Sequence, residues 1–202
     1  MNQMASRLDF FERLYTASSD PYGLRDRWYE ARKRALLLAA LPRRRFASAF
    51  EPGCGTGELS VELAARCDAV LASDFSARAV ELARQRSSGL SHVTVERQSM
   101  PDDWPRHKHF DLIVLSELCY FLDDEARERL AAQCVPSLKP GGVLVACDWR
   151  LDFEARTVAS EAWHRRLDQV GLSRLARYED ADYLLALWST DPASVAQQEG
   201  IR

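Results

Sequence analysis

The 202-residue chain lacks the features that would direct it to a membrane, to nucleic acid or to an export pathway. No apolar run approaches the ~18 residues needed to span a bilayer. Residues 1–15 carry charges where a signal peptide would have an apolar core. The net charge of -3 gives no general attraction to nucleic acid or to an anionic membrane surface. We therefore expect neither a nucleic-acid partner nor a membrane span.

Cysteine and histidine are also too scattered for a disulfide framework or a metal centre. The five cysteines form no C-x-x-C pair, and several lie inside apolar patterns, which is typical of reduced, buried thiols in a cytoplasmic protein. The four histidines have no cysteine or carboxylate partners at metal-ligand spacing. We expect no metal site and a cytoplasmic location, and the oligomeric state stays open.

The length and the 47% hydrophobic content favour one domain over residues 1–202, with a helical cap over 1–42 and an α/β core over 45–190. After Pro21 the sequence predicts an amphipathic helix that ends before Pro42. Its expected apolar stripe consists of Trp28, Ala31, Ala35, Leu38 and Ala39.

Short apolar runs then alternate with helical patterns, which predicts a mostly parallel sheet with helices on both faces. The expected strands are 46–51, 69–74, 93–98, 110–116 and 143–148, and the expected helices are 58–66, 77–86 and one starting at Asp123. The segment KPGG is expected to form a turn before the strand 143–148. A further helix is expected to end at Gly171. Ser76 and Asp123 are predicted N-caps. Two final strands, 173–178 and 183–188, are separated by only four residues, so they must be antiparallel neighbours.

The glycine-rich segment FEPGCGTGELS, residues 50–60, lies between a predicted strand and a predicted helix. Such a cluster indicates positive φ or a ligand lying against the backbone, and this turn borders the ligand crevice of an open α/β sheet. A phosphate-binding P-loop would need Lys and Ser or Thr where Glu58 and Leu59 stand. A dinucleotide fingerprint would need glycine at position 58, and a carboxylate there would repel pyrophosphate. The turn therefore favours a ligand without phosphate.

FEPGCGTGEL resembles the first motif of class I methyltransferases, whose cofactor S-adenosylmethionine carries a cationic sulfonium and no phosphate. FDLIVLSELCYFLDD is similar to their fourth-strand motif, and LKPGGVLVA to the turn and fifth strand that follow. The resemblance covers most of residues 45–190. It implies an α/β, Rossmann-like class I methyltransferase fold with a C-terminal antiparallel β-hairpin.

A closer resemblance is to the nodulation protein S (NodS)-like family. It is carried by SDPYGLRDRWYEARKRALLLAALPRRRFASAFEPGCGTGELS, by SELCYFLDD and by ALWSTDPASVAQQEG. The namesake of the family N-methylates an amino sugar of a lipo-chitooligosaccharide, on the deacetylated nitrogen of its non-reducing end. The resemblance implies methyl transfer to a small-molecule or oligosaccharide acceptor.

Asp74, at the end of the next predicted strand, is placed to accept hydrogen bonds from the ribose hydroxyls; its alternative role is in the first turn of the following helix. The family's W-Y-E-x-R-K helix implies aromatic faces near the sulfonium and a cation near the methionine carboxylate. Alternatively, Trp28 packs in the core and the cations Arg32 and Lys33 are solvated. The full set of cofactor residues that the resemblance implies is Trp28, Tyr29, Arg32, Glu51, Gly53, Gly55, Gly57, Asp74, Phe75, Ser99, Met100 and Ser116.

Asp148, Glu117 and Tyr120 are the candidate catalytic residues, since they follow the fourth and fifth strands at the same crevice. Methyl transfer is an in-line displacement, so positioning can supply most of the rate. An amine acceptor must also lose its proton to a carboxylate or to water. Alternatively, Glu117 fixes its loop through backbone hydrogen bonds and Asp148 pairs with Arg150.

The expected function is therefore S-adenosylmethionine-dependent N-methylation of an amino sugar or a related polar amine. O-methylation of another small molecule and a cofactor-binding module without turnover remain as alternatives. A nicotinamide-dependent oxidoreductase is disfavoured by Glu58 and by the terminal hairpin.

Overall fold

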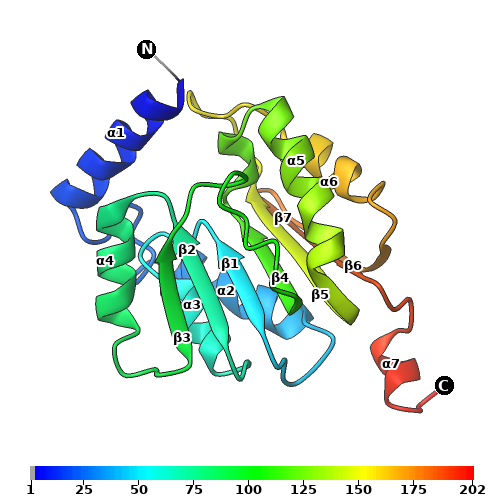
Figure 1. Cartoon of the computed structure of the whole chain (residues 1–202). Helices are drawn as coiled ribbons and strands as arrows, with labels where there is room; N and C mark the ends of the chain where they lie inside the picture. The colour runs from blue at the N-terminus through cyan, green and yellow to red at the C-terminus, as the bar shows by residue number, and fades with distance from the viewer. Residues whose placement is uncertain (1–2) are drawn as a thin grey trace.

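The protein is built on a seven-stranded sheet, described by a computed structural model that covers residues 3–202, without the side chains of residues 3–6. The strand order is β3-β2-β1-β4-β5-β7-β6 (Figure 1). The strands are β1 (Ala49–Pro52), β2 (Val70–Asp74), β3 (Val93–Arg97), β4 (Phe110–Ser116), β5 (Leu138–Trp149), β6 (Ser173–Glu179) and β7 (Tyr183–Ser189). Strands β1 to β5 pair in parallel, and β7 is antiparallel to both β5 and β6. The predicted fold class is confirmed.

Helices cover both faces of the sheet (Figure 1). They are α1 (Gln3–Ala17), α2 (Trp28–Ala40), α3 (Glu58–Ala64), α4 (Ala77–Arg86), α5 (Asp124–Cys134), α6 (Ser160–Leu167) and α7 (Val195–Gln198), with 3-10 turns η1 (Cys119–Phe121) and η2 (Val135–Ser137). Helices α2 and α3 share one apolar cluster with the sheet, and α5 and α6 share another on the opposite face. Helix α1 packs on α4, where Phe11 and Tyr15 contact Ala79 and Leu82.

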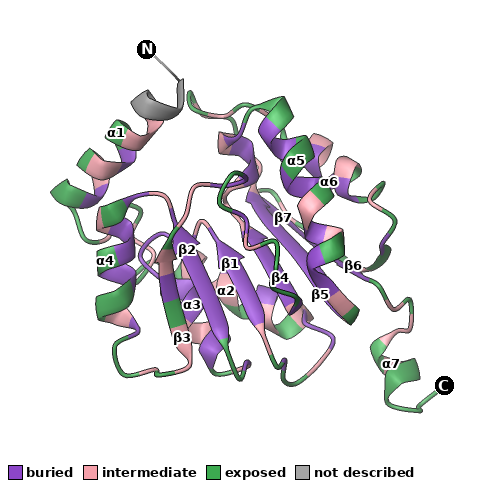
Figure 2. Ribbon diagram, in the orientation of Figure 1, coloured by how far each residue is buried: buried purple, intermediate pink, exposed green. Residues whose placement is uncertain are grey.

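Strand β4 shows how one sequence serves both layers. Leu112 and Val114 point into the cluster with α2 and α3, whereas Ile113 and Leu115 point into the cluster with α5 and α6. Side chains alternate across a strand, so a strand buried on both faces has to be apolar at every position. Figure 2 shows the central strands buried and the edge strands β3 and β6 partly exposed.

Most of the predicted elements are present with close boundaries. Helix 77–86 and strand 110–116 match in full, and the side chains of Ser76 and Asp123 accept the N-cap hydrogen bonds from Ala79 and Ala126 at 3.1 and 2.8 Å. The boundaries of three elements differ most. Strand β1 begins at Ala49, after the predicted start at residue 46. The segment KPGG lies inside β5, where the pairing with β4 shifts register between Phe110 and Leu112. Helix α6 ends at Leu167, ahead of the predicted end at Gly171.

The predicted stripe of α2 is wrong. Trp28 is 78% exposed, and the buried residues of the helix are Lys33 and Leu37. A buried lysine breaks the hydrophobic periodicity on which the prediction depends, because its charge is compensated by carboxylates from other elements. Helix α1 was also not predicted as an element, although Phe11, Leu14 and Tyr15 recur at helical spacing.

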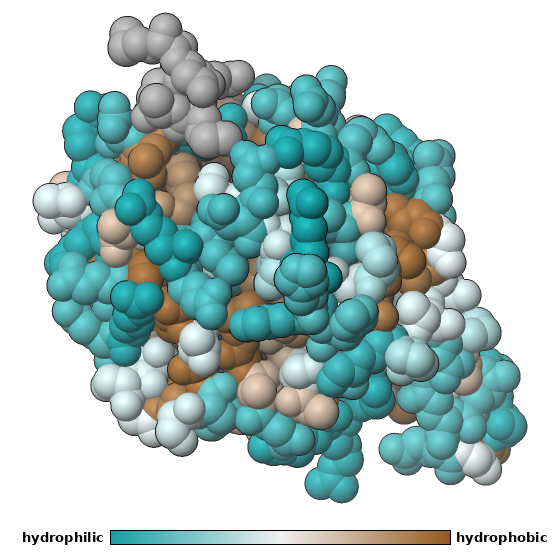
Figure 3. Space-filling view, in the orientation of Figure 1, coloured by the Kyte–Doolittle hydropathy of each residue, from teal (hydrophilic) through white to brown (hydrophobic). Residues whose placement is uncertain are grey.

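Hydrophilic residues cover most of the face shown in Figure 3, with hydrophobic residues visible in smaller areas between them. Within residues 3–202, no helix is long and apolar enough to cross a bilayer. All five cysteines are free and buried, as the sequence predicts.

Candidate active site

A cavity of about 830 Å³ lies at the carboxyl ends of β1, β2, β4 and β5, bordered by α1 and α2. Most of the predicted site residues line it: Tyr29, Glu51, Gly53, Gly55, Asp74, Phe75, Ser99, Met100, Ser116, Glu117 and Tyr120. Trp28, Arg32, Gly57 and Asp148 are predicted site residues that do not line it. The sheet therefore brings together residues from every segment between 29 and 120 that the motifs single out.

The three glycines of the first motif all have positive φ, at +74°, +53° and +80° for Gly53, Gly55 and Gly57. A Cβ on Gly53 would lie 3.0 Å from Leu118, and one on Gly55 would lie 3.1 Å from the hydroxyl of Tyr15. These two glycines therefore shape the cavity wall. Gly57 has a different role: it caps α3, and a Cβ there would lie 3.0 Å from the Cβ of Ala83 in α4.

Asp74 joins the glycine turn to the next helix. One carboxylate oxygen accepts a hydrogen bond from the backbone N–H of Gly55 at 3.0 Å, and the other accepts from Ser76 at 2.9 Å. Burial raises the pKa of Asp74 to about 6, although these backbone donors act in the opposite direction. Asp74 therefore both stabilises the turn before α4 and lines the cavity.

Glu51 is a second buried carboxylate in the cavity wall. It accepts a hydrogen bond from the hydroxyl of Ser60 at 2.5 Å, and burial raises its pKa to about 8. Among the described residues, no cation pairs with Glu51 or Asp74. Two such carboxylates fit a ligand that carries positive charge and polar hydroxyls, as S-adenosylmethionine does.

Glu58 has a different environment from the one assumed in the sequence argument. Its carboxylate is paired with Arg25 at 2.9 Å and with Arg86 at 2.7 Å, and its side chain is 9% exposed. These partners compensate its charge, so its repulsion of a pyrophosphate is weaker than the sequence alone suggests.

Glu117 is the centre of a polar cluster at the end of β4. Its backbone has φ +55°, the left-handed conformation that non-glycine residues rarely adopt. One carboxylate oxygen accepts from Lys33 Nζ at 2.7 Å, and the other accepts from the backbone N–H of Trp149 at 3.0 Å and from the hydroxyl of Tyr120. Glu117 therefore fixes its loop to β5 and also faces the cavity.

The charge of Glu117 acts to raise the pKa of both Lys33 and Tyr120. Burial by itself lowers the pKa of Lys33, but Glu117 and Glu30, the latter at 3.1 Å, outweigh it, so the net pKa is raised and the ammonium stays charged. Burial, followed by the negative charge of Glu117, raises the pKa of Tyr120 well above its usual value, so the phenol keeps its proton.

Arg32 and Trp28, both predicted cofactor residues, lie outside the cavity. Arg32 pairs with Asp180 at 2.9 Å and donates to the hydroxyl of Tyr178 at 2.5 Å. Lys33 and Arg34 are the cations of α2 that line the cavity, and Arg32 is not, because successive helix residues are about 100° apart around the axis. The motif predicts a cofactor-binding cation on this helix, but only the packing of α2 decides which cations face the cavity.

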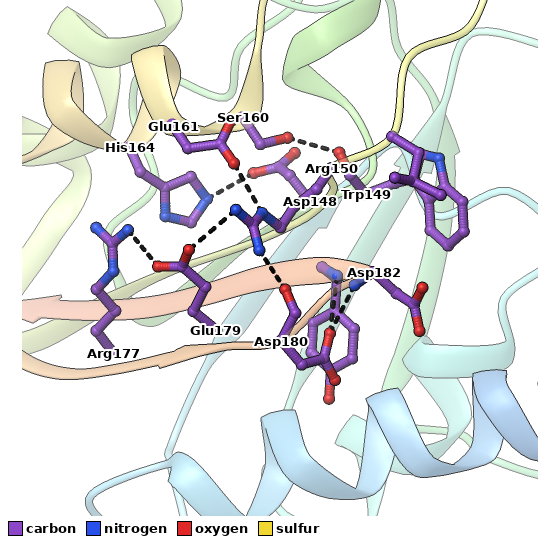
Figure 4. Close-up of polar contacts among 12 residues, drawn as sticks. Asp148, Trp149, Arg150, Ser160, Glu161, His164, Arg177, Glu179, Asp180 and Asp182 are labelled. Carbon is purple, nitrogen blue, oxygen red and sulfur yellow. Dashed lines mark hydrogen bonds and ion pairs between the residues drawn. The ribbon is translucent and has the colours of Figure 1, made fainter.

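Asp148 is 1% exposed and is also separated from the cavity. Its carboxylate lies 2.9 Å from Nε2 of His164 in α6 (Figure 4). Arg150, its alternative partner in the sequence analysis, instead pairs with Glu161 at 2.7 Å and Glu179 at 3.0 Å. The carboxylate of Asp148 therefore does not face the cavity, and its role as a base stays a prediction.

Sequence reasoning missed several cavity residues. Phe11 and Tyr15 of α1 and Tyr22 of the following turn line it. The helical spacing of the apolar residues in α1 could have revealed the first two. Nothing in the sequence links His164 to Asp148, because the pairing depends on how α6 lies on the sheet.

Comparisons with known proteins agree with this arrangement. A family model described as a methyltransferase domain matches residues 49–142. The crystal structure of a candidate methyltransferase from Pseudomonas syringae is 46% identical, with a TM-score of 0.71 over 81% of this chain and 99% of that one. The crystal structure of N-methyltransferase NodS from Bradyrhizobium japonicum, in complex with S-adenosyl-L-homocysteine, is 27% identical, with a TM-score of 0.80 over 90% and 97% of the two chains.

Nodulation protein S from Rhizobium tropici is 31% identical over 131 residues, which are 64% of this chain and 55% of that protein's length. The chain thus matches little more than half of this relative. The fold, the cavity and these similarities define a class I S-adenosylmethionine-dependent methyltransferase. Within that class, the chain is similar to the NodS proteins.

Proposed function

We propose that this methyltransferase N-methylates an amino sugar or a related polar amine. The observation that carries the proposal is the Glu117–Tyr120 pair, a carboxylate and a protonated phenol that face the cavity together. A carboxylate attracts a protonated amine and can accept its proton. The similarity to a protein named N-methyltransferase NodS supports the same chemistry.

The cofactor is assigned to the half of the cavity at β1 to β3. Asp74 binds the ribose hydroxyls, Glu51 lies near the cationic amino-acid end, and the backbone at Ser99 and Met100 borders the adenine. The glycine turn contacts the cofactor through its backbone at Gly53 and Gly55. Bound there, S-adenosylmethionine supplies an electrophilic methyl group, and helices α1 and α2 act as the cap that excludes water.

The acceptor is assigned to the ends of β4 and β5. Glu117 holds the amine and accepts its proton, directly or through a water molecule. Lys33 and Tyr120 hold the Glu117 side chain in place through their hydrogen bonds to it. We also propose that the enzyme works in a reducing compartment such as the cytoplasm, since all five cysteines are free.

The test is to incubate the enzyme with S-adenosylmethionine and either a fully deacetylated glucosamine trimer or its acetylated form. We expect S-adenosylhomocysteine release and a methylated amine, located by mass spectrometry, with the deacetylated trimer only. Methylation on a hydroxyl would support the O-methyltransferase alternative. Cofactor binding without release of product, across a panel of amines and alcohols, would support a module without turnover.

A further inference from the structure

Three polar groups at the acceptor end of the cavity have no protein partner among the residues that the structure describes. They are the hydroxyl of Tyr29, which is itself buried, and two groups on half-buried side chains, the indole N–H of Trp149 and the carboxylate of Asp182; all three residues line the cavity. Polar groups that face a pocket without a partner are the ones that a ligand or ordered water satisfies. The residues come from α2, from the end of β5 and from the turn between β6 and β7.

Asp182 is fixed in position although its side chain is free. Its backbone N–H donates to the carboxylate of Asp180 at 2.9 Å, and its carbonyl accepts from the N–H of Arg150 at 2.8 Å. Asp180, in the same turn, is occupied by Arg32 and by the backbone of residues 182 and 183. One carboxylate of the turn thus serves the fold, and the other is left for the cavity.

The backbone of β5 relates Asp182 to Glu117. The N–H of Trp149 donates to Glu117, and the next N–H along the chain, that of Arg150, donates to Asp182. Consecutive N–H groups of a strand point to opposite sides, so the two acidic residues flank the end of β5, about 10 Å apart at two strand spacings. Figure 4 shows the indole of Trp149 and the carboxylate of Asp182 on the same side of the close-up, away from His164.

We propose that Asp182, with Trp149 and Tyr29, forms an outer acceptor subsite that binds a positively charged, hydroxyl-bearing ring beside the one that is methylated. The carboxylate binds the ammonium or hydroxyl groups of that ring, and the indole provides an aromatic face and a donor. This inference rests on the proposed function for the type of acceptor, and it adds a charge-selecting residue that the sequence motifs do not include.

The experiment measures binding apart from turnover. The enzyme, saturated with S-adenosylhomocysteine, is titrated calorimetrically at about pH 6, where amino groups are charged, with the fully deacetylated glucosamine trimer and with the acetylated trimer. The variants are Asp182→Asn and, as the matched control, Glu179→Gln. Glu179 carries the same charge nearby but lies outside the cavity.

We expect Asp182→Asn to weaken binding of the deacetylated trimer about tenfold, the loss of one charge-assisted contact. Binding of the acetylated trimer and of S-adenosylhomocysteine should stay within about twofold of wild type, and Glu179→Gln should behave as wild type. An unchanged dissociation constant in Asp182→Asn, equal losses for both trimers, an equal loss in Glu179→Gln, or no binding of either trimer to wild type would each overturn the subsite.

A parallel assay of S-adenosylhomocysteine release separates this inference from the proposed function. A trimer that binds through Asp182 but is not methylated would contradict the proposed function and leave the subsite standing. If the trimer is methylated, and Asp182→Asn binds it with the affinity of wild type, the proposed function stands and the subsite is contradicted.

Discussion

Asp74 is the residue through which the glycine turn, the following helix and the proposed ribose contact are connected. We expect Asp74→Ala to weaken S-adenosylmethionine binding by about 1–3 kcal/mol, because it removes charge-assisted hydrogen bonds to the ligand. Calorimetry on the folded variant measures this. The control is Asp68→Ala, which removes an exposed carboxylate whose partner is Arg45. A dissociation constant equal to that of wild type would exclude the ribose role.

Glu117 should matter to turnover more than to cofactor affinity, because it lies at the acceptor end of the cavity. We expect Glu117→Gln to lower kcat about 10²-fold, with the larger loss at low pH where the acceptor is protonated. Its thermal stability should also fall, since Lys33 is buried and would keep only Glu30 as a partner. Steady-state kinetics across pH, with calorimetry of S-adenosylmethionine binding, test this.

Asp148→Asn is the informative comparison for that variant. Asp148 is paired with buried His164 outside the cavity, so its substitution should lower Tm and change kcat much less than Glu117→Gln does. A larger kcat effect at Asp148 than at Glu117, with the fold intact, would show that the base acts from the buried pair.

At the scale of elements, the first motif serves packing as well as binding. Gly57 has φ +80°, and an added Cβ would meet Ala83 of α4. We expect Gly57→Ala to destabilise the protein by about 1–3 kcal/mol through backbone strain and displacement of α3 from α4. Denaturant unfolding measures it.

Alanine variants of two other glycines distinguish the cost of backbone strain from the cost of a steric contact of the added Cβ. Gly141 has φ +73° but open space around its Cβ position, so Gly141→Ala should cost only the strain, about 1–2 kcal/mol. Gly89 has open space and no positive φ, so Gly89→Ala should be close to neutral. If all three variants had equal stability, the packing role of Gly57 would be refuted.

At the scale of the whole molecule, two buried carboxylates make the stability of the ligand-free protein depend on pH. The pKa of Glu51 is about 8 and that of Asp74 about 6, both above their unfolded values of 4.5 and 3.8. At a pH between its unfolded-state and folded-state pKa values, each carboxyl group is protonated in the folded state and ionised in the unfolded state. The contribution of these two groups is therefore fully present below about pH 4 and is lost as the pH rises through 6 and then 8.

We thus expect Glu51→Gln to raise Tm relative to wild type more at pH 8 than at pH 5. Ser60→Ala removes the hydroxyl that donates to Glu51 and should have the opposite sign at pH 8. Thermal unfolding in a series of buffers tests this, and a Glu51→Gln effect that is independent of pH would contradict the raised pKa.

The sequence by itself determined the fold class and the succession of strands and helices along the chain. A short, continuous apolar run such as 110–116 predicts a strand that is buried on both faces. The four residues between 178 and 183 are too few for a crossover helix, so the two strands that they join must be antiparallel. The caps Ser76 and Asp123, and the positive φ of the glycine turn, are likewise local. They depend on backbone sterics and hydrogen bonds within a few residues, so the local sequence is enough to predict them.

Only the tertiary structure decided which polar residues enter the cavity. Lys33 rather than Arg32 faces inward because Glu30 and Glu117 compensate its burial, and Asp148 is enclosed because α6 brings His164 against it. Asp182 is free because Asp180 takes the contacts of their shared turn. The physical reason is common to all three. The stability of a buried charge depends on partners distant in sequence, and their distances exist only once the sheet and helices have packed.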